Sequence, residues 1–276
     1  MKKPLARPYL QSLVRLLALL ACAFVALQLF FVLRIACMLW LDPQSTAFER
    51  SQAWQRVQAT GSLRWRQQWR DYDQISVHLK RAVIASEDDS FSSHDGLDWV
   101  ALEKAWAKNA KAEDRAAQRA AQNAAAKAKN ARAPKVVGGS TITQQLAKNL
   151  FLSGERSLLR KGQELVLTLV LEQLLGKQRI LEIYLNSVEW GEGVFGAEAA
   201  AQHYFRKSAA QLTPYEAARL VVMLPRPRYF EKLPNSEYLS ARAQVIVARM
   251  GDARLPGGPP GGFWASTPAC APPVLA

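Results

Sequence analysis

The stretch at residues 81–96, RAVIASEDDSFSSHDG, gathers acidic side chains and an imidazole within a basic chain. Its ionisable side chains beyond the apolar run are Glu87, Asp88, Asp89, His94 and Asp95. Carboxylates and histidine are the groups that most often move protons in catalysis, so this stretch is a candidate catalytic segment. A lone histidine is more typical of a structural role, and we assign one to His94.

Two glycines in GGSTITQQLAKN, residues 138–149, lead into a helix start that we expect Ser140 to cap. Gln144, Gln145 and Lys148 then fall on adjoining positions of one helix face. A capped helix start with a lysine one turn on suits an anion. From spacing alone, an ordinary capped surface helix is the commoner explanation.

The segment ERSLLRKGQE, residues 155–164, places the cations Arg156, Arg160 and Lys161 ahead of Glu164. Arg160 and Lys161 precede Glu164 at spacings that are typical of plain ion pairs on a helix surface. Glu164 stands at the entry of an apolar helix, where an unpaired carboxylate is costly and a paired one is held in position. The residues themselves leave both explanations open.

The elements that must position these side chains are helices. TPYEAARLVVML begins with an N-cap at Thr213 and with Pro214 at the first helical position. SLLRKGQELVLTLVLEQLLG is apolar on nearly every face from Leu165 to Leu175, so we expect a buried central helix that stops at Gly176. Sustained period-two alternation is missing from the sequence, which predicts a mainly α domain over residues 76–250.

The N-terminal region carries a candidate membrane anchor. Residues 16–33 read LLALLACAFVALQLFFVL, with Gln28 the only strongly polar side chain, and the apolar run resumes after Arg34. Such a run crosses a hydrocarbon core of about 30 Å. A cleaved signal peptide is the alternative, but its apolar region spans only about 7 to 15 residues. Four basic residues precede the run, so we expect a cytoplasmic segment at 1–15 and an uncleaved anchor at 16–41.

The net charge and the amino-acid composition limit the classes of partner that the protein could bind. The net charge of +13 indicates an anionic partner, and an anchored chain makes nucleic acid unsuitable, which leaves a membrane surface or phosphate chemistry. Three scattered cysteines do not predict a disulfide framework or a zinc site. The flanking segments are a juxtamembrane stretch at 42–75, an Ala/Lys-rich insert at about 107–133 and a Pro/Gly-rich tail at 251–276 that we expect to be disordered.

Taken together, EDDSFSSHDG, GGSTITQQLAKNLF, RKGQE and ILEIYLNSVEWGEGVFGAEAAAQHYF resemble the peptidoglycan glycosyltransferases of glycosyltransferase family 51, in particular the monofunctional biosynthetic transglycosylases. The resemblance covers residues 76–230. It implies a lysozyme-like helical domain on the outer, periplasmic face of a bacterial inner membrane. That domain would polymerise lipid II into glycan strands by inverting transfer, as part of cell wall biosynthesis.

The resemblance also implies a role for each site residue. Glu87 is the base that takes the proton of the acceptor sugar's 4-hydroxyl, beside Asp88 and with His94 and Gly96 as scaffold. The polyprenyl pyrophosphate leaving group is met by Lys148, Arg156, Arg160 and Lys161, while Ser140, Gln144 and Gln145 hydrogen-bond sugar or phosphate. Glu164 matches the second glutamate, which orients the basic cluster or helps to hold a divalent cation, Mg or Mn. No other cofactor is implied, and other cell wall synthesis proteins stay open as partners.

Two departures and two alternatives accompany this assignment. The Ala/Lys-rich insert makes the region about twenty residues longer than we expect for the family. The sequence has no Ser-x-x-Lys, Lys-Thr-Gly or Lys-Ser-Gly motif, so we expect no transpeptidase activity. A lysozyme-like hydrolase or lytic transglycosylase would share the fold and a catalytic glutamate, whereas a membrane-anchored scaffold would need only the basic surface.

Overall fold

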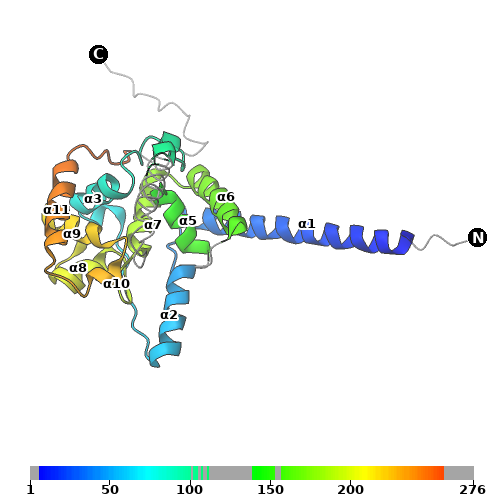
Figure 1. Cartoon of the computed structure of the whole chain (residues 1–276), viewed down its shortest axis with the longest axis horizontal. Coiled ribbons are helices and arrows are strands. Elements are labelled where there is room, and N and C mark those ends of the chain that lie inside the picture. Colours follow the sequence, from blue (N-terminus) through cyan, green and yellow to red (C-terminus); the bar gives the residue numbers. More distant parts are fainter. Residues whose placement is uncertain are drawn as a thin grey trace, which may run out of the picture.

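The computed structural model describes residues 6–100, 102–104, 107, 111, 139–152 and 157–257. The chain forms a helical head from which one long helix projects (Figure 1). The insert and the tail expected from the sequence lie mostly outside the described residues. The expected mainly α fold is confirmed.

The projecting helix is α1 (Ala6–Cys37). Its segment Gln11–Cys37 has a mean hydropathy of 2.8 and is long and apolar enough to cross a membrane. The inner end of α1 is part of the head, where Ile35 of the helix and Met38, just beyond it, are buried. Gln28, the polar residue of the apolar run, exchanges amide hydrogen bonds of 3.1 and 3.0 Å with Gln163. These contacts fix α1 to the head, and the paired amides explain how an apolar helix accommodates a glutamine.

The head is built from two groups of helices and a small sheet. In one group α3 (Val77–Glu87), α9 (Pro214–Met223) and α11 (Glu237–Arg249) pack together, and in the other α5 (Ile142–Phe151) packs against α6 (Leu158–Leu174) and α7 (Lys177–Ser187). Further helical elements among the described residues are α2 (Ala47–Thr60), α8 (Ala197–Phe205), α10 (Pro227–Phe230) and the 3-10 turns Tyr72–Gln74 and Ala209–Gln211. One continuous set of buried apolar side chains runs through both groups.

The sheet has the strand order β1-β3-β2, with β1 (Arg66–Gln67) parallel to β3 (Val194–Phe195) and β2 (Glu189–Gly191) antiparallel to it. Arg66 pairs with Val194 and Glu189 with Phe195. Strands of two or three residues are too short to give a period-two pattern, so the sequence did not predict them.

The helix expected from TPYEAARLVVML is α9. The Thr213 hydroxyl caps it by accepting a hydrogen bond from the Glu216 backbone N–H at 3.3 Å, and the Glu216 carboxylate accepts one from the Thr213 backbone N–H at 3.0 Å. Pro214 lies at the start of the helix, where its missing N–H leaves no bond unmade. The capping signal in the sequence is confirmed.

The expectation that the helix after Ser157 is buried on nearly every face is wrong. Along α6 and its C-cap, one stripe is buried, formed by Glu164, Leu167, Thr168, Leu171 and Leu175. Leu165, Val166 and Leu169 are exposed. The helix packs on α5 and on α1 at the side of the head from which α1 emerges, so its other apolar face has no protein partner among the described residues (Figure 1).

A buried carboxyl lies at the start of α2. Glu49 is fully buried, and it completes a capping box by accepting the Thr46 backbone N–H at 2.8 Å. Burial raises the pKa of Glu49 from 4.5 to about 7, against the opposing hydrogen bonds of Thr46 and the charge of Arg50. The folded chain therefore holds a proton that the unfolded chain releases, and the stability from the protonated form is lost as the pH rises through about 7.

Glu49→Gln should remove this pH dependence while keeping a side chain that can complete the capping box. We expect the free energy of unfolding of the variant, relative to the unmodified protein, to rise by about 3 kcal/mol between about pH 5 and about pH 8. Denaturant unfolding in detergent measures the difference. The matched control is Glu237→Gln, an exposed first-turn glutamate of α11, whose difference should stay flat. A flat difference for Glu49→Gln would contradict the raised pKa.

Candidate active site

The carboxylate of Glu87 lies where three helices meet. Glu87 is the last residue of α3, and its Oε2 accepts a hydrogen bond of 3.0 Å from the Gln145 side chain of α5. The amide oxygen of Gln145 in turn accepts the hydroxyl of Tyr184, from α7, at 3.0 Å. The buried Tyr184 thus fixes which end of the Gln145 amide faces Glu87.

The surroundings of Glu87 make it a stronger base than an ordinary glutamate. Burial raises the pKa of its carboxyl, and the negative charge of Asp88 adds to the effect. The hydrogen bond from Gln145 and the charge of Lys148 lower the pKa and partly offset this rise. A carboxylate with a raised pKa accepts a proton more readily, provided that the pH keeps it ionised.

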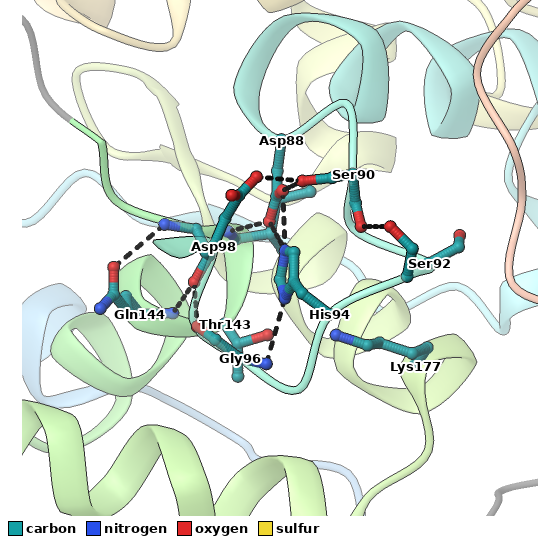
Figure 2. A network of polar contacts seen from close by, with 12 residues as sticks. Asp88, Ser90, Ser92, His94, Gly96, Asp98, Thr143, Gln144 and Lys177 are labelled. Carbon is teal, nitrogen blue, oxygen red and sulfur yellow. Dashed lines mark hydrogen bonds and ion pairs between the residues drawn. The ribbon is translucent and has the colours of Figure 1, made fainter. Parts of the chain in front are cut away.

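Asp88, in contrast, stabilises the loop that follows α3. Its carboxylate accepts the backbone N–H of Ile142 at 3.0 Å and contacts His94 Nε2 at 2.9 Å (Figure 2). His94 Nδ1 accepts the Gly96 backbone N–H at 3.1 Å, which assigns the proton of the neutral ring to Nε2, facing Asp88. Asp88 and His94 therefore tie the acidic loop to the first turn of α5.

Gly96 makes a second connection between the loop and α5. Its carbonyl accepts the Thr141 hydroxyl at 2.7 Å, and its φ of +84° lies in the left-handed region that favours glycine. A Cβ at this position would lie 2.8 Å from Glu172 Cγ and 2.9 Å from Thr168 Cγ2. A larger residue would therefore have to displace the side chains of Glu172 and Thr168.

The expected capping residue of α5 was wrong by one position. Thr141, not Ser140, is the N-cap, and its hydroxyl accepts the Gln144 backbone N–H at 3.2 Å. The amide oxygen of Gln144 accepts the Thr141 backbone N–H at 3.1 Å, which completes a capping box. The signal was present in the sequence as T-x-x-Q over residues 141–144. Ser140 is exposed, and the Gln144 oxygen is engaged by the helix start.

Glu164 lies at the centre of the basic cluster on α6. Its buried carboxylate accepts Arg160 Nη1 at 3.1 Å through one oxygen and Lys161 Nζ through the other. Arg160 Nε is buried and has no partner among the described residues, which leaves a donor for a ligand. Arg156 lies outside the described residues.

Lys148 connects the two halves of the site. The protein atoms around the Lys148 amine partly remove it from water, and this desolvation lowers its pKa. The side chain nevertheless keeps an exposed surface. Glu164 and Glu87 raise the pKa, while Arg160 and Lys161 lower it further. Lys148 thus interacts electrostatically with both glutamates, and the structure brings Glu87, Gln145, Lys148, Arg160, Lys161 and Glu164 into one group.

Two contributors to this group were missed in the sequence. Thr141 was overlooked because Ser140 precedes it, and Tyr184 because it falls within an apolar helix pattern. A tyrosine that is buried with the apolar face needs a hydrogen-bond partner for its hydroxyl, and this is the signal that could have found it. Within the described part of the chain, no group of three or more His, Cys, Asp or Glu side chains is arranged to hold a metal ion.

The sequence of this chain resembles those of known proteins over most of its length. The family described as Transglycosylase matches residues 55–122 and 115–251, two stretches that overlap within the Ala/Lys-rich segment. The "Biosynthetic peptidoglycan transglycosylase" of Burkholderia thailandensis is 51% identical over 236 residues, covering 86% of this chain and 84% of that protein. The protein of the same name from Paraburkholderia phytofirmans is 50% identical over 244 residues, covering 88% of this chain and 93% of the relative. The chain belongs to the transglycosylase family.

Proposed function

We propose that this protein is a peptidoglycan glycosyltransferase that polymerises lipid II into glycan strands and has no transpeptidase activity. The observation that carries the proposal is the placement of a base beside a cationic cluster. Glu87 has a raised pKa and is held by Gln145, and Lys148 links it to Arg160, Lys161 and Glu164. Family membership supports the same reaction.

Transfer requires one proton acceptor and several cations. Glu87 takes the proton of the acceptor 4-hydroxyl while the oxygen attacks the anomeric carbon of the donor sugar. The bond from that carbon to the pyrophosphate breaks, and its electrons leave with the pyrophosphate. Lys148, Arg160 and Lys161 stabilise the developing negative charge, and the unpartnered Nε of Arg160 is a donor for a phosphate oxygen.

Glu164 acts as a positioning residue. Both of its oxygens are taken by Arg160 and Lys161, so the carboxylate orients these two cations toward the leaving group. The same occupancy makes it a poor ligand for a divalent cation, because a metal would have to displace both cations. Glu164 therefore orients the two cations.

α1 and the basic N-terminus support a proposal for the location of the protein. We place residues 1–15 in the cytoplasm, the anchor at 16–41 in the inner membrane of a bacterium and the catalytic domain at 76–250 on the periplasmic side. The juxtamembrane stretch at 42–75 then lies between the anchor and the catalytic domain. A lipid-linked substrate would reach the site from the membrane surface.

The decisive test separates the two glutamates. Glu87→Gln removes the proton acceptor but keeps the shape, so lipid II binding should survive while polymerisation falls by at least about 100-fold. Glu164→Gln should lower turnover and also weaken donor binding, because Arg160 and Lys161 lose their partner. Gel separation of glycan made from labelled lipid II gives the rates, and titration of lipid II gives the binding.

The matched control is Asp89→Asn, an exposed carboxylate two residues beyond Glu87 whose ion pair with Arg249 is 3.5 Å long. It should polymerise normally. Near-normal polymerisation by Glu87→Gln would overturn its role as the base. Consumption of finished glycan instead of lipid II would show a hydrolase or lytic enzyme, and unchanged behaviour of both variants would favour a scaffold.

A second test uses the pH dependence of polymerisation. Glu87 must be ionised to accept a proton, so activity is lost on the acidic side of its pKa. Because the Gln145 hydrogen bond lowers that pKa, Gln145→Met should move the acidic limb of kcat/KM to higher pH. The position of the limb, not the maximal rate, is the measurement. The control Glu237→Gln should leave the acidic limb in place. An unmoved acidic limb in Gln145→Met would show that Gln145 does not influence the pKa of Glu87.

The anchor has its own test. If α1 is an uncleaved span, mass spectrometry of the protein purified from membranes should find the N-terminus close to residue 1, and a C-terminal alkaline phosphatase fusion should be active. A mature N-terminus beyond residue 40 would show a cleaved signal peptide. An inactive fusion that is present at full length would reverse the proposed orientation.

A further inference from the structure

A cavity of about 270 Å³ lies in the corner between the inner end of α1 and the start of α2. Arg34 and Cys37 line it from α1, Ser45 from the connecting segment and Arg50 from α2. It is separate from the group around Glu87, none of whose members lines it. Figure 1 shows that α2 runs at a steep angle to α1, so the two helices form the walls of this corner.

Two guanidinium groups share the cavity, and neither forms an ion pair within the described part of the chain. Arg34 lies over the ring of Phe151 at 5.2 Å, and Arg50 Nη1 donates to the carbonyl and the hydroxyl of Ser45 at 3.0 and 2.9 Å. These contacts hold both arginines in place and leave other N–H donors of each guanidinium for a ligand. The two positive charges are close enough to repel one another.

The nearby carboxylates do not neutralise this pair. Asp42 also lines the cavity, but it forms an ion pair of 2.8 Å with Arg179. Glu49 adjoins Arg50, yet it directs its carboxylate to the Thr46 backbone. The cavity therefore keeps a net positive charge, which an anion would balance.

The position along α1 indicates where that anion comes from. Arg34 lies one turn before the end of the apolar segment Gln11–Cys37, at the depth where arginine side chains reach head-group phosphates. Trp40 and Leu41, just beyond α1, are 80% and 65% exposed, and tryptophan is enriched at membrane interfaces. Leu41 lines the cavity and Trp40 precedes it in the sequence, so the cavity adjoins a segment that suits a membrane interface.

We propose that this cavity binds the phosphate of an anionic lipid between Arg34 and Arg50. The inference rests on α1 being the membrane anchor and does not depend on the catalytic roles of Glu87 and Glu164. Arginine suits this ligand because its planar fork donates two hydrogen bonds to one phosphate. A bound head group would also join α1 to α2 and so fix the height of the head above the membrane.

The test is native mass spectrometry of the full chain released from micelles that contain equal amounts of phosphatidylglycerol and phosphatidylcholine. We expect the protein to retain phosphatidylglycerol in preference. The double variant Arg34→Gln/Arg50→Gln should lose that preference by about fivefold for each charge removed. The single variant Arg50→Gln should lose about half of the preference for phosphatidylglycerol on a logarithmic scale. Because Arg50 lies outside the apolar segment, this variant shows the loss without any change to the anchor.

The matched control is Arg242→Gln, an exposed arginine of α11 on the opposite group of helices, which should keep the full preference. If Arg242→Gln and Arg50→Gln lost the preference for phosphatidylglycerol equally, the preference would come from the overall positive charge of the protein and not from this cavity. That result would overturn the proposal. An unselective wild-type protein, or an undiminished preference in the double variant, would do the same. Polymerisation of lipid II is measured in parallel, so an inactive protein that still selects phosphatidylglycerol would refute only the proposed function.

Competition then identifies the source of the phosphate. Added polyprenyl pyrophosphate that displaces phosphatidylglycerol assigns the cavity to the lipid-linked substrate or product, whereas phosphatidylglycerol that stays bound assigns it to membrane phospholipid. Either result supports a lipid-phosphate site. Displacement by inorganic phosphate at the same concentration would show a site for free anions and would contradict the proposal.

Discussion

The hydrogen bond from the Ile142 backbone N–H to the Asp88 carboxylate is the constraint on which the site depends. It joins the end of α3 to the start of α5, across 54 residues of sequence. A negative charge at a helix start is favourable, and the His94 N–H directed at the same carboxylate fixes its orientation. Because Asp88 is held, the adjacent Glu87 is placed against Gln145, and the loop to Gly96 closes on Thr141.

The proposed catalytic group around Glu87 balances two opposing electrostatic requirements. Glu87 needs burial to raise its pKa, but a buried carboxylate also needs a partner that keeps it ionised. Gln145 and Lys148 supply that partner without forming a tight ion pair, which would make the carboxylate too weak a base. Glu164 shows the opposite arrangement, since two cations occupy it and it serves them as an anchor.

Hydrogen bonds join α1 to the helices at the side of the head from which it projects. Gln28 and Gln163 pair their amides, Arg179 donates to the Met38 carbonyl at 2.9 Å, and these bonds hold the anchor against α6 and α7. α6, which carries exposed apolar side chains, lies on the side of the head from which α1 projects. The exposed apolar side chains and the cationic cluster on this helix would suit a substrate that combines a lipid tail with a charged pyrophosphate.

The sequence by itself determined the features that depend on neighbouring residues. These are the apolar segment of α1, the capped start of α9, the mainly α fold and the motifs that assign the chain to its family. Local pattern could also nominate Glu87, Lys148 and Glu164, since each lies in a motif. It misjudged α6, because a residue pattern that is apolar all round does not say whether protein or lipid covers each face.

Only the tertiary structure decided which of the neighbouring carboxylates is available. Glu87, Asp88 and Asp89 are consecutive and chemically alike, so the sequence singled out Glu87 only through its resemblance to the family motif and gave no physical reason for the difference. Their roles diverge because Ile142 and Gln145, which lie 54 and 58 residues further along the chain, contact Asp88 and Glu87 respectively, while Asp89 stays at the surface. The pKa of a carboxyl is set by its burial and by its partners, and both come from chain segments that meet only in the folded protein.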